Sequence, residues 1–131
     1  MNSRTSSPSS TSSVYFLYII RTSSNTLYTG ITTDLERRWK EHSRLKAGSK
    51  YLKAVRPQEL VAAWLLETDE TTDIPVRSLA SKLESKVKSL DREQKLQLIQ
   101  RPSRIKRFDE CQVCRCKSIH ASRRRAIEKL I

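Results

Sequence analysis

The stretch Val14–Ile20 constrains the fold of this chain more than any other. It is an unbroken run of apolar or aromatic residues, Val-Tyr-Phe-Leu-Tyr-Ile-Ile. β-Branched and aromatic side chains favour strands, and a run of this length is too short for a helix. The run therefore predicts a strand that is covered on both faces.

Two further stretches complete a predicted three-stranded antiparallel sheet. The turn-forming residues Thr22–Asn25 separate the first strand from a second β pattern at Thr26–Ile31, and together they indicate a hairpin. Leu60–Leu66 is another apolar run and predicts a third, buried strand.

The sheet is expected to be flanked by helices, which gives an α+β fold. Short side-chain oxygens at Thr32–Asp34 can cap a helix over Leu35–Leu45. An amphipathic helix is predicted where apolar residues recur at helical spacing, at Leu79, Leu83, Val87 and Leu90. One more short helix is expected to start at Ser89 or Asp91.

Composition divides the chain into three parts. Residues 1–13 are mostly Ser and Thr and are expected to be a disordered lead-in. Residues 14–100 carry the apolar patterns and are expected to form one small domain. Residues 101–131 are basic and include Arg123-Arg124-Arg125 and a cysteine cluster, so they are expected to be a tail whose charges contact phosphate groups.

The sequence carries no signal for export or for membrane insertion. No apolar run approaches the roughly 18 residues of a membrane span, and the first residues lack the apolar core of a signal peptide. The 3 cysteines are an odd number within one short segment, which argues against a disulfide framework. We therefore expect a cytoplasmic protein with no membrane partner.

The net charge of +12 arises from 26 Lys and Arg against 14 Asp and Glu. An excess of this size is typical of proteins that bind a polyanion, most simply nucleic acid, because phosphates attract Lys and Arg. The alternative is that the charge serves solubility alone.

Two tyrosines and a glycine share one face of the predicted hairpin. Pairing around the turn brings Tyr18 opposite a residue close to Tyr28 or Gly30, and either register puts both phenols on the same face. A glycine inside a strand marks a bulge or a close approach by a ligand. The phenols could grip a phosphate and relay a proton, or they could pack together with their hydroxyls at the rim.

The first predicted helix carries an arginine on its inward stripe. Arg38 and His42 share this stripe with Leu35 and Leu45, whereas Arg37 lies on the outer side. An inward guanidinium is costly unless it meets an anion such as a phosphate; otherwise its side chain reaches out to the helix edge. His42 would be a second donor, a proton acceptor or a satisfied boundary residue.

Glu84 lies on the flank of the predicted amphipathic helix. A carboxylate at the edge of a basic site can anchor Mg²⁺ or Mn²⁺, with water and phosphate as the remaining ligands. The alternative is a surface glutamate paired with Lys88, four residues further along the helix.

These residues resemble the motifs of the GIY-YIG endonuclease family, and in particular of its short, single-domain branch. The two signature tripeptides match Leu17-Tyr18-Ile19 and Tyr28-Thr29-Gly30, with Leu17 in place of the first glycine. The pattern of the branch continues at Gly48-Ser49-Lys50-Tyr51 and around Glu84. The resemblance covers roughly residues 14–99 and leaves the basic tail outside.

The resemblance implies a divalent-metal-dependent endonuclease that hydrolyses phosphodiester bonds in DNA, with structure-selective cleavage in repair or recombination as its role. The implied catalytic residues are Tyr18, Tyr28, Arg38, His42 and Glu84. Glu84 would hold one Mg²⁺ or Mn²⁺ ion, Arg38 would neutralise charge at the phosphate, and one tyrosine would position or deprotonate the attacking water. Contacts with DNA are expected at Arg37, Lys50 and Tyr51, and no small-molecule cofactor is expected.

The tail contains four residues that could bind zinc, namely Cys111, Cys114, Cys116 and His120. Tetrahedral zinc accepts such ligands, but the single residue between Cys114 and Cys116 is tighter than the usual spacing of zinc ligands. We therefore favour free thiols in a basic segment over a zinc site.

Two other functions compete with a nuclease. A catalytically inactive nucleic-acid-binding module would keep the fold and the basic surface, and a ribosome- or RNA-associated protein would explain the charge. The presence of Tyr18, Tyr28, Arg38 and Glu84 together favours the enzyme.

Overall fold

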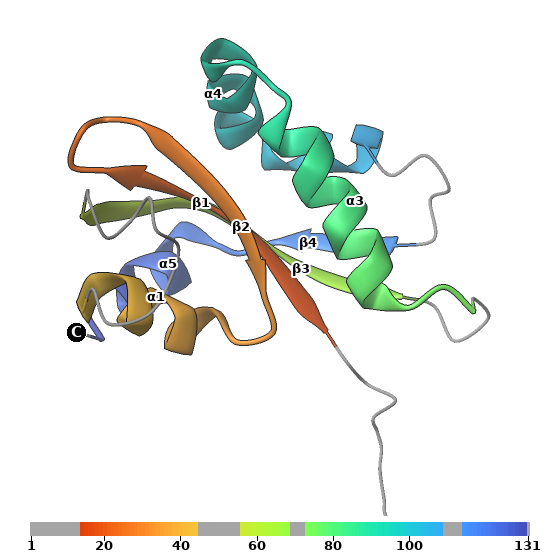
Figure 1. Cartoon of the computed structure of the whole chain (residues 1–131), viewed down its shortest axis with the longest axis horizontal. Helices are drawn as coiled ribbons and strands as arrows, with labels where there is room; N and C mark the ends of the chain where they lie inside the picture. The colour runs from red at the N-terminus through yellow and green to blue at the C-terminus, as the bar shows by residue number, and fades with distance from the viewer. Residues whose placement is uncertain (1–13, 45–55, 69–72, 109–113, 131) are drawn as a thin grey trace, which may run out of the picture.

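The apolar run at the start of the chain forms the inner strand of a sheet. Figure 1 shows a computed structural model, which describes residues 14–44, 56–68, 73–108 and 114–130. Strand β1 (Tyr15–Thr22) pairs antiparallel with β2 (Leu27–Thr32) on one side and with β3 (Pro57–Thr68) on the other. Its inner residues are fully buried, so the prediction of a strand covered on both faces is confirmed.

The sheet has four strands, one more than the sequence predicted. Strand β4 (Cys114–Ser118) pairs antiparallel with β3, which gives the order β2-β1-β3-β4. This strand was missed because its sequence, Cys-Arg-Cys-Lys-Ser, is polar and charged, and edge strands tolerate such residues. The segment expected to be a tail outside the domain therefore contributes to the sheet.

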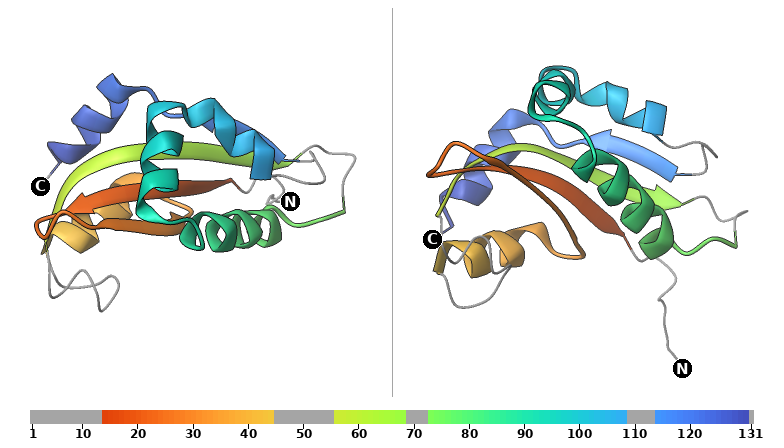
Figure 2. Two further views of the ribbon diagram at one scale, coloured as in Figure 1. Left: turned by 90° about the horizontal axis from the view of Figure 1, so that it is seen from above. Right: turned by 45° about the horizontal axis from the view of Figure 1, so that its top comes forward.

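Helices cover both faces of this sheet and form two layers (Figures 1 and 2). Helix α1 (Leu35–Arg44) and helix α5 (Ala121–Glu128) cover one face, where Leu35, Trp39 and Ile127 pack with Tyr18 and Ile20. This arrangement places the inward stripe of α1 directly over the tyrosine face of the hairpin.

The other layer consists of α3 (Val76–Lys88), α4 (Arg92–Gln100) and the 3₁₀ helix η2 (Pro102–Phe108). Apolar residues of this layer pack against Leu17 and Ile19, which point to the face opposite Tyr18 because side chains alternate along a strand. The predicted α+β fold, an antiparallel sheet flanked by helices, is confirmed.

Side-chain caps begin two of the helices where the sequence predicted them. The carboxylate of Asp34 accepts a hydrogen bond from the backbone N–H of Arg37 at 3.1 Å, at the start of α1. Asp91 and Gln94 form a reciprocal capping box at the start of α4. Such caps satisfy backbone donors that the first turn of a helix leaves unpaired.

Arginine side chains hold α5 against β3. Arg124 donates from Nε to the carbonyl oxygen of Leu60 at 3.0 Å and from Nη1 to that of Ile119 at 2.7 Å. In return, the backbone N–H of Leu60 donates to the carboxylate of Glu128 at 2.7 Å. Arg125 donates to the carboxylate of Glu59 at 3.1 Å. Two of the three arginines expected to contact phosphate therefore hold the fold together.

We expect Arg124→Ala to lower the free energy of unfolding by about 2 kcal/mol, because it removes charged donors from two backbone carbonyls. The matched control is Arg123→Ala, since Arg123 is exposed and its side chain makes no hydrogen bond within the described part of the chain. That substitution should change stability by less than about 0.5 kcal/mol. Urea unfolding measures both, and equal losses would contradict the structural role of Arg124.

The longest described helix, α3, has 13 residues. A helix needs about 20 predominantly apolar residues to span a bilayer, and the described part of the chain contains no such helix.

Candidate active site

Tyr18 and Gly30 face each other across the hairpin and define the centre of the site. They are direct partners in the β1–β2 register, as the sequence analysis predicted. Tyr18 is only 1% exposed, and its hydroxyl lies over Gly30. A Cβ atom at Gly30 would lie 2.5 Å from the Tyr18 hydroxyl oxygen and 2.7 Å from Cζ. The group that closely approaches Gly30 is therefore Tyr18, and not the ligand or the bulge that the sequence suggested.

Three aromatic rings cluster at this point. The ring centroids of Tyr18 and Tyr28 are 6.4 Å apart, and the ring of His42 lies 6.1 Å from Tyr18 and 5.8 Å from Tyr28. Tyr28 is partly exposed, whereas Tyr18 and His42 are buried. The two phenols thus lie on one face as diagonal neighbours, with Tyr28 as the member closer to solvent.

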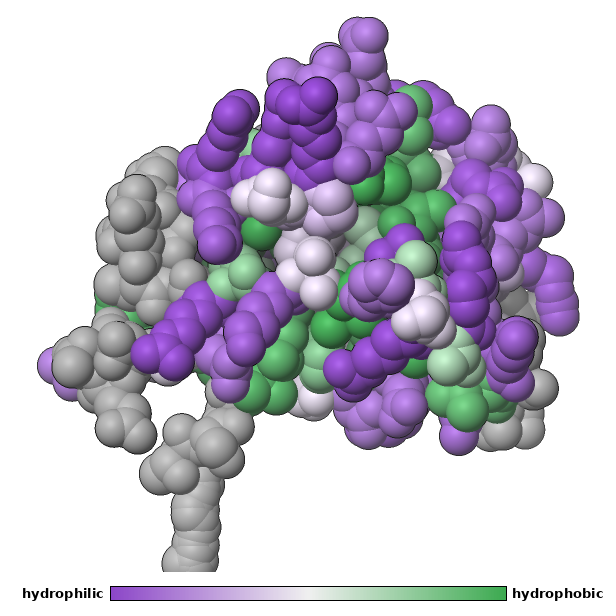
Figure 3. Space-filling model, turned by 180° about the vertical axis from the view of Figure 1, so that it is seen from behind, coloured by the Kyte–Doolittle hydropathy of each residue, from purple (hydrophilic) through white to green (hydrophobic). Residues whose placement is uncertain are grey.

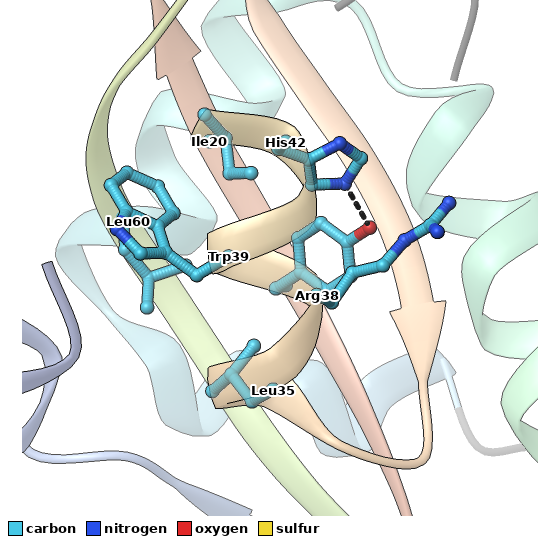
Figure 4. Close-up of a pocket in the computed structure, with 7 residues that line it drawn as sticks. Ile20, Leu35, Arg38, Trp39, His42 and Leu60 are labelled. Carbon is cyan, nitrogen blue, oxygen red and sulfur yellow. Dashed lines mark hydrogen bonds between the residues drawn. The ribbon is translucent and has the colours of Figure 1, made fainter. Parts of the chain in front are cut away.

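His42 comes from α1 and bonds the buried tyrosine. Its Nε2 atom and the Tyr18 hydroxyl are hydrogen-bonded at 3.1 Å, as Figure 4 shows by a dashed line. Its Nδ1 atom is buried without a hydrogen-bond partner among the described residues. His42 therefore contacts Tyr18 through Nε2, while Nδ1 has no hydrogen-bond partner among the described residues.

The environment fixes the protonation states of this pair. Burial, followed by the positive charge of Arg38, lowers the pKa of His42 to about 4. Burial also raises the pKa of Tyr18 to about 12; Arg38 opposes this shift, whereas Tyr28 and Glu84 add to it. At neutral pH the imidazole is uncharged and the phenol keeps its proton, so the Tyr18 hydroxyl can donate to Nε2.

We expect stability to fall as the pH is lowered through the titration range of His42. Because its folded pKa lies below the ordinary value of about 6.5, the unfolded chain binds a proton that the folded chain resists. The stabilisation is complete above about pH 6.5 and is lost towards pH 4, at a cost of roughly 3 kcal/mol. Urea unfolding at pH 7, 5.5 and 4 measures this slope, and His42→Gln should flatten it. An equally steep slope in the variant would contradict the assignment.

Arg38 lies at the rim of the same cluster. Its side chain lines a hollow with Leu35, Trp39 and Leu60, which is packed too tightly to hold water, and the guanidinium leaves this apolar group (Figure 4). The Arg38 side chain is 29% exposed, and Nη1 donates to the carboxylate of Glu41 at 3.1 Å. Its Nε atom is buried without a partner among the residues described. The arginine therefore reaches out from the inward stripe, and its partly exposed guanidinium is the part that an anion can reach.

Glu41 was not singled out from the sequence. It lies three residues after Arg38, a spacing that places two side chains next to each other on a helix. That spacing is the signal that could have identified it. Glu41 is the ion-pair partner of Arg38 among the described residues.

Glu84 approaches the cluster from the opposite helix layer. Helix α3, which carries it, packs on β1 and β2. The Glu84 side chain is 22% exposed and forms an ion pair with Nζ of Lys88 at 3.3 Å, as expected for the surface alternative. Burial and, to a smaller extent, Tyr28 raise the pKa of Tyr18, and the charge of Glu84 makes a still smaller contribution in the same direction. The carboxylate is thus paired and within electrostatic reach of the tyrosine hydroxyl.

The Glu84 carboxylate has the chemistry of a ligand for one hard divalent cation. Mg²⁺ is commonly held by one or two carboxylates, with waters and phosphate oxygens completing its shell. Glu84 supplies one carboxylate, and within the described ranges no three Asp, Glu, His or Cys side chains gather around a common point. This donor set suits an ion completed by substrate and not a cage built by protein alone.

The residues proposed as zinc ligands have other contacts. Cys116 is buried in the core on the α3 side of the sheet. His120 precedes α5 on the other face, where its Nδ1 atom accepts a hydrogen bond from the backbone N–H of Ser122 at 3.2 Å. Cys111 and the side chain of Cys114 lie outside the described residues. The structure therefore does not bring Cys116 and His120 together.

The expected DNA contacts are only partly described. Arg37 is exposed on α1, on the helix that carries Arg38 and His42. Lys50 and Tyr51 lie outside the described residues, as does the Ser- and Thr-rich segment 1–13. Figure 3 shows hydrophilic side chains interleaved with smaller apolar areas on the face turned away from the viewer in Figure 1.

The chain is similar to several curated proteins. The chain is 43% identical over 86 residues to the UPF0213 protein YhbQ of Escherichia coli, which covers 65% of this chain and 76% of the relative. It is 42% identical over 86 residues to a UPF0213 protein of Citrobacter koseri, with the same coverage. A UPF0213 protein of Syntrophus aciditrophicus is 38% identical over 91 residues, or 69% of this chain and 95% of the relative. No solved structure gives a significant match.

The family model described as the GIY-YIG catalytic domain matches residues 14–97, which contain the whole cluster from Tyr18 to Glu84. The match ends before η2, β4 and α5, so the segment that completes the sheet lies beyond it. With the tyrosine hairpin, the arginine helix and the glutamate helix all inside the matched region, the chain belongs to the GIY-YIG family.

Proposed function

We propose that this protein is a divalent-metal-dependent endonuclease that hydrolyses phosphodiester bonds in DNA. The observation that carries the proposal is the hydrogen bond between Tyr18 and His42 above Gly30. A guanidinium lies beside this pair, and a carboxylate lies within its electrostatic reach. Family membership and a net charge of +12 support the same conclusion.

Arg38 has the chemistry to bind the scissile phosphate. Its guanidinium is partly exposed, and its Nε donor has no partner among the described residues. A fixed cation beside a phosphate stabilises the charge that builds up on the phosphoryl oxygens during displacement. Exchange of Glu41 for a phosphate would keep Arg38 paired throughout.

The two phenols have different surroundings and therefore different proposed roles. Tyr18 keeps its proton at neutral pH because its pKa is about 12. Its oxygen can accept a hydrogen bond from the attacking water while its proton is donated to Nε2 of His42. Tyr28 is the more exposed phenol, so it is placed to contact the water or the phosphate directly. His42 acts through Tyr18 by fixing the direction of its hydroxyl.

Glu84 is the proposed ligand of one Mg²⁺ or Mn²⁺ ion. When bound, such an ion polarises the scissile phosphate and stabilises the leaving oxygen. Lys88 would have to release Glu84, and its exposed side chain can do so because surface ion pairs contribute little.

The function is tested with labelled duplex, single-stranded, branched and damaged DNA, each incubated with and without Mg²⁺ or Mn²⁺. We expect cleavage that requires the metal and stops when EDTA is added. A preference for branched DNA would assign the enzyme to repair or recombination. Binding without cleavage of any substrate would instead identify an inactive nucleic-acid-binding module, and cleavage insensitive to EDTA would overturn the metal requirement.

A further inference from the structure

A second hollow lies between α4 and η2, in the helix layer that also contains Glu84. Its volume is about 190 Å³, and its apolar lining comes from Leu90, Leu98 and Phe108. Leu98 is buried, whereas Leu90 and Phe108 are partly exposed. At roughly 30 Å³ for each water, the hollow has room for about six water molecules. A flat ring system fits this space, while a complete cofactor usually needs about 300 Å³ or more.

Two glutamines add hydrogen-bonding groups to the lining of this hollow. Gln94 and Gln97 lie on α4 and line the hollow. The side-chain oxygen of Gln94 accepts from the backbone N–H of Asp91 at 3.0 Å, which fixes the side chain. Its NH₂ group remains a donor. Amide side chains with both donors and acceptors are suited to the polar edges of nucleobases.

Two arginines give the hollow a positive charge. Arg104 and Arg107 lie on η2 and line it, and among the described residues no carboxylate does. Within the described part of the chain, neither arginine side chain forms an ion pair or a hydrogen bond. Their charges are therefore available to an anion, and guanidinium groups suit phosphate oxygens.

Two lysines place positive charge next to Glu84 and next to this hollow. Lys88 pairs with Glu84 at 3.3 Å, and burial, followed by the charge of Lys88, lowers the pKa of Lys95 on α4. Lys95 directly follows Gln94, which lines the hollow. A polyanion bound at the active site could therefore continue over positive charge towards α4.

We propose that the hollow between α4 and η2 binds one unpaired nucleotide of a nucleic-acid strand, with its base against Leu90, Leu98 and Phe108 and its phosphates on Arg104 and Arg107. An unpaired nucleotide is required because a base stacked inside a duplex cannot enter a pocket. The inference deepens the proposed function by naming the class of substrate, and it rests on that function for the choice of nucleic acid as ligand. The family match ends at residue 97, and Leu98, Arg104, Arg107 and Phe108 of the pocket lining lie outside it.

The test measures binding in EDTA, so that cleavage plays no part. Fluorescence anisotropy of a labelled eight-nucleotide single strand is recorded with the full chain and with the double variant Arg104→Gln/Arg107→Gln. The matched control is Arg101→Gln/Lys106→Gln, which removes the same charge from exposed positions next to or within η2 that do not line the hollow. We expect the pocket variant to lose about tenfold in affinity and the control about twofold.

A second comparison separates the base from the phosphates. The unchanged protein should bind the normal strand several-fold more tightly than the same strand with abasic sites, and the pocket variant should lose this preference. Equal losses in the two double variants, or equal binding of normal and abasic strands by the unchanged protein, would overturn the inference. Selective binding in EDTA without cleavage in Mg²⁺ would leave the pocket standing and refute the nuclease. Cleavage in Mg²⁺ combined with equal losses of affinity in the two double variants would support the nuclease and refute the pocket.

Discussion

Glu84→Gln should reduce metal-dependent cleavage by about a hundredfold or more and leave the fold intact. The substitution removes the carboxylate charge that would hold the cation, and a lost electrostatic contact of this kind typically costs several kcal/mol in the transition state. Within the described part of the chain Glu84 forms an ion pair only with Lys88, whose side chain is 53% exposed, so stability should change little. Initial cleavage rates over a range of Mg²⁺ concentrations measure the effect.

Two matched variants make this result specific. Glu93→Gln removes the same charge from an exposed position in the first turn of α4 and should leave cleavage unchanged. Lys88→Gln removes the competitor for the Glu84 carboxylate and should lower the Mg²⁺ concentration needed for half-maximal activity. Wild-type rates in Glu84→Gln would show that the cation is bound elsewhere.

Gly30→Ala should both destabilise the protein and abolish most of its activity. The new methyl group would lie 2.5 Å from the Tyr18 hydroxyl oxygen, and that ring is buried and hydrogen-bonded to His42. Either the ring leaves His42 or β2 moves away from β1. Forcing extra volume into a packed site costs about 1–3 kcal/mol. Urea unfolding should show a lower free energy of unfolding, and cleavage assays should show a lower rate.

A double-mutant cycle identifies the clash as the cause. Tyr18→Phe removes the closest of the opposing atoms, so Gly30→Ala should cost less stability in that background than in the unchanged protein. Additive losses would mean that the glycine is needed for the backbone of β2 and not for the placement of Tyr18.

Elements with strong apolar patterns could be predicted from the sequence. The apolar run of β1, the turn before β2 and the spaced leucines of α3 each indicate one structure. Strand β4 and helix α5 could not be predicted in the same way, because β4 buries Cys116 and α5 buries Ile127 as their principal apolar contacts. What holds α5 is a set of arginine hydrogen bonds to carbonyl groups of β3 and the adjoining chain, and a sequence shows those arginines only as surface charge.

The candidate site, too, could be predicted from the sequence only in part. The shared face of Tyr18 and Tyr28 follows from strand alternation, and the position of Arg38 and His42 over that face follows from helical spacing. The hydrogen bond between the Tyr18 hydroxyl and His42 depends on side-chain rotamers, and the distance of Glu84 from Tyr18 depends on how α3 lies across the sheet. Neither can be obtained from spacing, because both are set by packing between layers that are distant in sequence.

Strand β3 is paired with β4 and bonded to α5, which lie near the end of the chain, and this order affects folding during synthesis. Every proposed catalytic residue has been synthesised once Glu84 is added to the chain. The backbone N–H and carbonyl of Leu60, however, bond Glu128 and Arg124, which are added more than 30 residues later. Until those residues emerge, the nascent chain presents an open strand edge, which invites pairing with other chains. Productive folding should therefore be largely post-translational, and chains truncated before β4 should aggregate even though they contain every residue proposed for catalysis.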